Sequence, residues 1–472
     1  MTQSPPSKKT REAATASAVS SRPNSKNLGL ASSILSSTET FAQSIAGIAP
    51  SASPAITVAI VFAMAGGGAW LAYAAATGIM ILTAVCISVF ASRQSSSGSL
   101  YSYANDSGGP LAGFTTGWAM LLAYVLGVTG GSVQFAIFAD AFLQNIGVHG
   151  VSSLVLVAIN LLGTTAIAYK NVKLSAELML WMEILSIGII LFLVWQSLAH
   201  HGFQIDLRQL HLTGCTPQGF GMGLVMALLA FVGFESATSL GTEAEKPLEK
   251  IPQTLIRSVV LCGVFFVIST YAIVQGFADS NINLATCTTP LVALSNSMNM
   301  NWLAVLTSLG AAASLFAATL AANTAAARIM LTMSHDGYLH PALKKVHPHN
   351  HTPTNAVLTV AALALVVITF LFAINSKPLD VVGWLGTLAT YSFILAYSMI
   401  SALMPVYLRK RGELKGHHIP LAILATTTMA AALFATVYPL PPAPYCWLPF
   451  LCLAYFVCGL IHFKTRKRGH HD

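Results

Sequence analysis

The chain has 472 residues, of which 55% are hydrophobic and only 8% charged, and its mean hydropathy is +0.68. Because a soluble globular chain carries about 25% charged residues, this composition excludes a soluble protein and predicts one polytopic membrane domain. The net charge of +8 does not indicate a nucleic-acid partner, since basic residues also hold the cytoplasmic loops of a membrane protein on the inner side.

Residues 1–40 are rich in Ser, Thr, Ala and Lys and contain no apolar stretch, so they predict a disordered cytoplasmic tail rather than a cleavable signal. Beyond this tail the sequence alternates between long apolar segments and short polar ones. Each apolar segment has the roughly 20 residues that one membrane crossing needs. We expect about twelve spans, near 41–65, 68–92, 113–143, 150–169, 174–199, 217–241, 255–279, 302–333, 354–374, 382–408, 418–438 and 444–463.

The basic residues predict how these spans are oriented. With both termini cytoplasmic, only Arg208 and Lys377 fall in outer loops, so 22 of the 24 Lys and Arg residues lie on the inner side. The opposite orientation would invert this ratio, and the positive-inside rule therefore selects the first. We expect a plasma (inner) membrane protein with both termini in the cytoplasm.

Two spans are interrupted in the same way. The first contains SIAGIAPSASPA, residues 44–55, in which Pro50 removes a backbone donor and breaks the helix. The sixth contains FVGFESA, residues 231–237, with Gly233 at its centre. Because five spans separate the two breaks, they occupy corresponding positions in two halves, as in transporters built from inverted repeats. A proline kink and a glycine packing notch are the alternative interpretation.

Two acidic residues lie within apolar spans. An acid at the centre of a membrane helix costs roughly 2.5–3.5 kcal/mol unless it faces a cavity or a partner, so Glu235 is a candidate proton carrier or a link between spans one and six. A permanently protonated structural acid is the alternative. Glu183, in the fifth span, is either a second proton site or a helix-packing residue.

Four stretches carry a resemblance to a known family. They are the FVGFES of the sixth span, SGSLYSYANDSGGPLAGFTTGW (97–118), GTEAEKPLEKIPQTLIRSV (241–259) and the segment 323–356 at the exit of the eighth span. Together they resemble an amino acid permease of the amino acid–polyamine–organocation superfamily. The resemblance implies an all-α membrane protein of the LeuT type, with a 5+5 inverted repeat and two extra helices.

The resemblance also implies a division of the chain. The transporter domain spans 41–463, and a cytoplasmic C-terminal tail, 464–472, follows it. The parts of the domain are the first repeat at 41–199, the second repeat at 217–408 and two additional helices at 418–463.

In this family the break in span one binds the substrate carboxylate through backbone N–H groups. Here it falls within Gly47–Ser51, and two alignments remain open: either Gly47, Ile48 and Ala49, or Ala49, Pro50 and Ser51, supply the binding backbone. In span six, Phe231, Val232 and Gly233 match the unwound piece whose carbonyls meet the substrate amine, and Phe234 is expected to pack on the substrate or its pathway.

The resemblance also indicates which residues to consider for binding the coupling ion. Some relatives carry a span-five lysine that acts in proton coupling, but Ser186 stands at that place here, and Glu183 is a candidate substitute. Ser314 and Thr319 stand where sodium-coupled relatives hold a cation. We favour protons over sodium. Tyr124 and Tyr391 are expected along the pathway, and Arg328 is expected to extend to the inner membrane interface.

We therefore expect a secondary transporter that imports a neutral amino acid, or a broad range of them, by proton symport, and uses no cofactor. A polyamine or amine carrier and an amino acid–product antiporter are the alternatives, and a non-transporting receptor or channel is the alternative from another class. No enzyme motif is present in the sequence, and the histidines of HPHNH, 347–351, are interpreted as a solvated loop rather than a metal site. The oligomeric state is left open.

Overall fold

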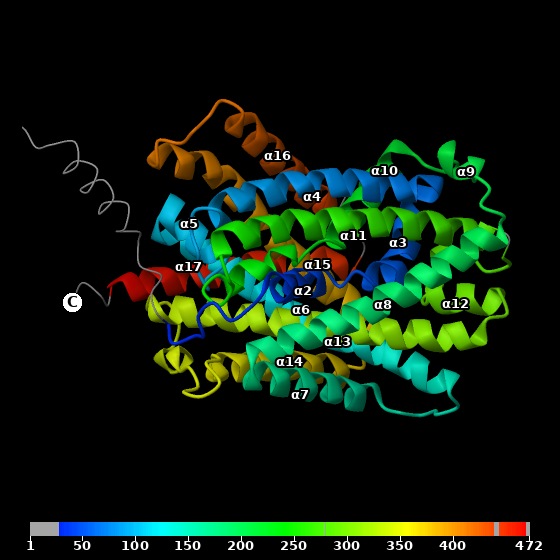
Figure 1. Cartoon of the computed structure of the whole chain (residues 1–472), viewed down its shortest axis with the longest axis horizontal. Coiled ribbons are helices and arrows are strands. Elements are labelled where there is room, and N and C mark those ends of the chain that lie inside the picture. Colours follow the sequence, from blue (N-terminus) through cyan, green and yellow to red (C-terminus); the bar gives the residue numbers. More distant parts are fainter. Residues whose placement is uncertain (1–27, 279, 439–442, 469–472) are drawn as a thin grey trace, which may run out of the picture.

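A computed structural model describes residues 28–278, 280–438 and 443–468, which form a bundle of helices (Figure 1). Eleven helical ranges within these residues are long and apolar enough to cross a membrane. The first, Ser37–Ala91, has 55 residues, whereas about 20 suffice for one crossing. The chain reverses within it at Gly66–Gly68, so that α10 packs against the helices on both sides of the turn. The described chain thus makes twelve crossings, as predicted.

The first five crossings contain a break in the first of them. The elements are α2 (Ser37–Ile48) followed by a π-helical turn (Ser53–Thr57) and α3 (Val58–Ala65), then α4 (Ala69–Ala91), α6 (Pro110–Asn145), α7 (Ser153–Lys170) and α8 (Val172–His200). The next five crossings have the same order, and the first of them is again broken. They are α10 (Pro217–Leu229) with η3 (Phe234–Leu240), α11 (Pro247–Ala278), α13 (Asn301–His335), α14 (Thr354–Ala373) and α15 (Pro378–Lys410).

Short helices mark the corresponding loop of each half. In the first half α5 (Leu100–Gly108) follows the second crossing, and in the second half α12 (Pro290–Ser297) does so. The two lie at opposite ends of the bundle (Figure 1). This opposite placement is what two halves of inverted orientation produce.

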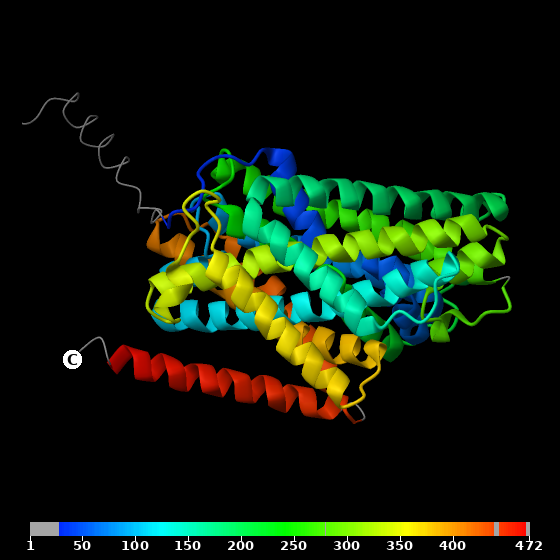
Figure 2. The same ribbon diagram turned by 90° about the horizontal axis from the view of Figure 1, so that it is seen from below.

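Burial separates the centre of the bundle from its periphery. The most apolar window of α13 is 72% buried, and α13 packs along α6. The last two crossings contain α16 (His418–Val437) and α17 (Leu448–Arg468), and the most apolar window of each crossing is only 22% buried. Figure 2 shows α17 along one edge. Their exposed apolar side chains are suited to lipid.

The two ends of the chain differ in detail from the expected tails. Residues 1–27 of the predicted 1–40 tail lie outside the described residues. The first helix begins at Ser37 rather than near 41, because Ser36 closes a capping box: its hydroxyl accepts from the Glu39 N–H at 3.3 Å, and Glu39 Oε2 accepts from the Ser36 N–H at 2.6 Å. At the other end α17 continues to Arg468, and residues 469–472 lie outside the described residues.

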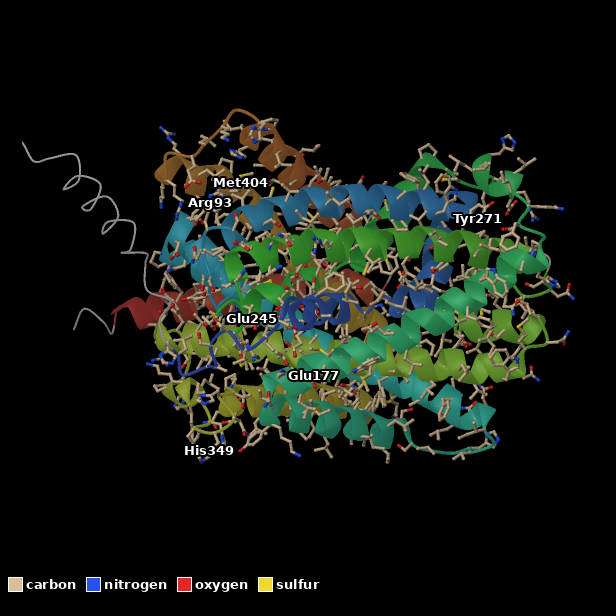
Figure 3. All side chains as sticks on the ribbon, viewed as in Figure 1. Arg93, Glu177, Glu245, Tyr271, His349 and Met404 are labelled. Atoms are coloured by element: carbon tan, nitrogen blue, oxygen red, sulfur yellow. The ribbon has the colours of Figure 1, made fainter. Side chains whose placement is uncertain are left out.

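Loops predicted to be internal share one end of the bundle. Arg93, Glu245 and His349 come from three such loops and lie at the left end of Figure 3, whereas Tyr271 lies at the right end. The described chain also begins and ends at the left end (Figures 1 and 2). We call the end that carries Arg93, Glu245 and His349 the inner end.

Candidate functional site

The first break lies between α2 and the π-helical turn. Ala49 adopts a left-handed conformation with φ of 53°, and its N–H reaches back to the carbonyls of Ile45 and Ala46 at 3.1 Å each. The helix cannot continue, because Pro50 has no N–H to donate. As a result, no hydrogen bond is found within the described residues for the N–H of Ser51 or for the carbonyl oxygens of Gly47 and Ile48.

These open groups include residues from both predicted alignments. Ala49–Ser51 is the non-helical piece, which fits the alignment on the helix breaker. Gly47 and Ile48, from the other alignment, are the last residues of the preceding half-helix. Their carbonyl oxygens are hydrogen-bond acceptors left open at the break. All residues from Ile48 to Ser51 are buried.

The second break lies between α10 and η3. Gly233 has φ of 98°, a conformation that glycine adopts at no steric cost. Its N–H donates to the Tyr397 hydroxyl at 3.2 Å, and its carbonyl accepts from the Ser236 N–H at 3.0 Å. Of the three predicted carbonyls, those of Phe231 and Val232 thus remain without a hydrogen-bond donor in the described part of the chain.

The two breaks are in direct backbone contact. A Cβ atom on Gly47 would overlap the carbonyl oxygen of Gly233, and a Cβ on Gly233 would overlap that of Gly47. Two hydrogen bonds extend the contact, from the Ser44 hydroxyl to the Phe234 carbonyl at 2.6 Å and from the Ser236 hydroxyl to the Gln43 carbonyl at 2.9 Å. The half-helices α2 and η3 are therefore joined as one unit.

Glu235 is the second residue of η3 and is fully buried, with 0% of its surface exposed. The Tyr124 hydroxyl on α6 donates to Oε1 at 2.6 Å, and the Tyr397 hydroxyl on α15 donates to Oε2. Because the Tyr397 oxygen already accepts from the Gly233 N–H, its proton is available to the carboxyl. The acid thus connects the second break to α6 and α15.

Of these two tyrosines, the sequence indicated only one. Tyr391, the expected residue on the tenth span, instead packs with Leu448 and Cys452 beside α17. Tyr397 lies on another face of the same helix, and its ring contacts that of Phe234 at 5.5 Å. The one sequence signal for it is the four-residue spacing from Phe393, whose ring packs edge-on against Tyr124 at 5.3 Å.

Glu183 lies apart from Glu235, on α8. It is 2% exposed, and its two oxygens lie 2.9 and 3.0 Å from one hydroxyl, that of Ser314 on α13. One turn further along α8, the Ser186 hydroxyl contacts the Ser51 hydroxyl in the first break. The helix α8 therefore connects a buried carboxyl to the break.

The two hydroxyls considered for sodium do not converge. Ser314 faces Glu183, whereas the Thr319 hydroxyl donates to the Leu315 carbonyl at 2.8 Å and accepts from Asn160 at 3.1 Å. Among the described residues, no group of three or more His, Cys, Asp or Glu side chains is arranged to hold a metal ion.

Arg328 differs from its expected position. It does not extend to the membrane interface but is 2% exposed and forms an ion pair with Glu243, which is 0% exposed. The reason is tertiary: the loop after η3 folds against α13 and brings a carboxylate to the guanidinium, so that burial and pairing replace solvation.

Comparison with known proteins places this geometry in a family context. A family model described as amino acid permease matches residues 32–461. The chain is 26% identical over 371 residues to the branched-chain amino acid permease BcaP of Bacillus subtilis (strain 168), covering 74% of this chain and 76% of that protein. It is 24% identical to the methylthioribose transporter of the same organism over 82% of this chain and 84% of that one. The low-affinity putrescine importer PlaP of Escherichia coli (strain K12) is 24% identical over 72% and 74%.

Proposed function

The chain belongs to the amino acid permease family, and from that premise we propose that it imports a neutral amino acid across the cytoplasmic membrane by alternating access around the two breaks. The family and these relatives are transporters rather than enzymes. The inner end carries the basic loops and would face the cytoplasm.

The observation that carries this proposal is the contact between the two breaks, each of which leaves backbone groups without a hydrogen-bond partner among the described residues. The Ser51 N–H is an open donor, which suits the α-carboxylate of an amino acid. The carbonyls of Phe231 and Val232 are open acceptors, which suit its α-amine. Backbone groups of this kind recognise the α-carboxylate and the α-amine, which all amino acids share.

The charges of the nearby acids support a neutral substrate over an amine. A cationic side chain would need a carboxylate that has no other partner. Near the breaks, Glu235 accepts two tyrosine hydroxyls, Glu243 is paired with Arg328, and Glu183 accepts from the Ser314 hydroxyl. The aromatic rings of Phe234 and Phe393 favour an apolar side chain. The putrescine importer among the relatives keeps an amine carrier, or an antiporter, as the second candidate.

For energy coupling we assign the proton to Glu183 and a gating role to Glu235. Glu183 has one hydroxyl partner and no cation within ion-pair distance in the described part of the chain, so a proton is the simplest way to neutralise it in a buried site. Through Ser186 and Ser51 its helix touches the substrate region. Glu235, held by tyrosines from two helices, is better suited to joining η3 to α6 and α15.

Uptake by purified protein in liposomes tests the proposal. Under an inward proton gradient, with sodium absent, we expect accumulation of leucine, valine or another neutral amino acid and none in empty liposomes. Putrescine uptake without amino acid uptake would favour the amine carrier. Accumulation that requires an internal amine would favour the antiporter, and uptake that requires sodium but ignores pH would refute proton coupling.

A further inference from the structure

One residue at the inner end joins its own loop to two other parts of the chain. Glu243 lies in the loop that follows η3, and its carboxylate accepts two hydrogen bonds from the Arg328 guanidinium, at 2.5 Å from Nε and 2.8 Å from Nη2. The remaining nitrogen, Nη1, donates to the Thr324 carbonyl at 3.0 Å. The guanidinium is thus held by the fork of one carboxylate and by its own helix, α13.

The main chain of the same residue binds the segment that precedes α2. The Glu243 carbonyl accepts from the N–H groups of Ile34 and Leu35 at 2.9 and 3.0 Å, and the Glu245 N–H donates to the Leu35 carbonyl at 2.8 Å. Leu35 and Ala244 form a parallel bridge, and the Leu35 side chain is fully buried. We call this set, Glu243 with Arg328, Ile34 and Leu35, the inner junction. Figure 3 labels Glu245 beside it.

The inner junction lies where the two half-helices reach the inner end. The segment 33–35 leads directly into α2, and Glu243 follows directly after η3, while Arg328 belongs to α13. Since α2 and η3 are joined at Gly47 and Gly233, any movement that opens the inner side must carry both away from α13. The ion pair, and the hydrogen bond from Gln43 Nε2 on α2 to the Ala321 carbonyl on α13 at 3.0 Å, are contacts that this movement has to break.

We infer that Glu243 holds the inner side of the transporter closed, with its carboxylate bound to α13 and its main chain bound to the entry of α2. This inference rests on the proposed alternating access. On opening, the carboxylate leaves the guanidinium, and the main-chain hydrogen bonds between Glu243 and the segment 33–35 become accessible to water. Because two separated charges are costly in a dry interior, opening requires water to enter at Arg328. Glu243 is therefore a positioning residue and not part of the substrate site.

Hydrogen exchange of the full-length protein in nanodiscs tests this directly, because the junction contains identified N–H donors. In Glu243→Gln the charge is lost at almost constant volume, and we expect the amides of residues 33–36 and 242–246 to exchange at least tenfold faster than in the wild type. In Arg328→Lys the charge remains but the two-pronged geometry is lost, so we expect a smaller acceleration of the same amides. Glu249→Gln, an exposed acid at the start of α11, is the matched control and should exchange like the wild type.

A functional measurement accompanies the exchange data. If the inner side opens more often, external substrate should bind at least fivefold more weakly in Glu243→Gln, while counterflow continues. Wild-type exchange at 33–36 in both variants would overturn the inference, and so would equal acceleration in all spans, which would mean general destabilisation. Exchange is read without transport, so absence of uptake by the wild type would refute the proposed function alone.

Discussion

The contact between the two breaks gives the most direct test of the proposed site. Gly47→Ala adds one methyl group at the point where α2 meets η3. That methyl would lie 2.5 Å from the Ser236 hydroxyl oxygen and closer still to the Gly233 carbonyl oxygen, whereas ordinary contact begins at 3.4 Å. The two half-helices must therefore separate by about 1 Å, and both neighbours are held by other bonds.

The size of the effect follows from the cost of overpacking. An extra methyl in a tightly packed site costs about 1–3 kcal/mol, and 1.4 kcal/mol corresponds to about a tenfold change in an equilibrium constant. If the separation distorts the backbone groups that bind substrate, affinity should fall by about 5- to 140-fold. The neighbouring carbonyls of Phe231 and Val232 would be displaced with Gly233.

Substrate binding by the purified variant, together with its melting temperature, measures this effect. The control is Gly188→Ala, because a methyl on Gly188 of α8 meets no atom within 4 Å, and it should bind like the wild type. Wild-type affinity and melting temperature in Gly47→Ala would refute the reasoning. A lower melting temperature with unchanged affinity would show that the contact is structural and that substrate binds elsewhere.

Three further predictions concern acids and their partners. Tyr397→Phe removes one of the two hydroxyls on Glu235, at a cost of about 1–3 kcal/mol, so we expect a lower melting temperature and at least fivefold slower uptake; wild-type uptake would contradict the gating role. Glu183→Gln should abolish accumulation driven by a proton gradient while counterflow persists, and the exposed Glu177→Gln on the same helix should behave like the wild type; equal loss of both activities would make Glu183 structural. Burial alone would raise the pKa of Asp206, but hydrogen bonds within its loop outweigh burial and lower this pKa below 3.8. The ionised Asp206 therefore stabilises the folded protein near neutral pH, and this stabilisation is lost as the pH falls through the lowered pKa. The melting temperature should therefore drop on acidification below about pH 4 in the wild type and less in Asp206→Asn.

The crossings and the places of the two breaks were predictable because they depend on local chemistry. Apolar length sets each span, and Pro50 and Gly233 act on their own backbone, so residue type alone indicates where a helix stops. The family was also recognisable from short motifs, and the match over residues 32–461 confirms it. The roles assigned to individual residues in the site remain predictions.

The partners of the buried polar groups were not predictable in the same way. Apart from its four-residue spacing from Phe393, nothing near Tyr397 in the sequence distinguishes it from Tyr391, yet of these two tyrosines Tyr397 is the one that reaches Glu235. Arg328 was expected at the interface because its helix ends there, but a loop 85 positions away supplies its carboxylate.

The sequence by itself thus determined the number of crossings, the basic end, the family and the position of each break, since hydropathy and backbone chemistry act within a few residues. Only the tertiary structure decided that Gly47 meets Gly233, that Glu183 faces Ser314, and that Glu243 ties three segments together. The physical reason is that a buried polar group needs a hydrogen-bond partner. The packing of the bundle decides which residue is close enough in space to be that partner, however far away it lies along the chain.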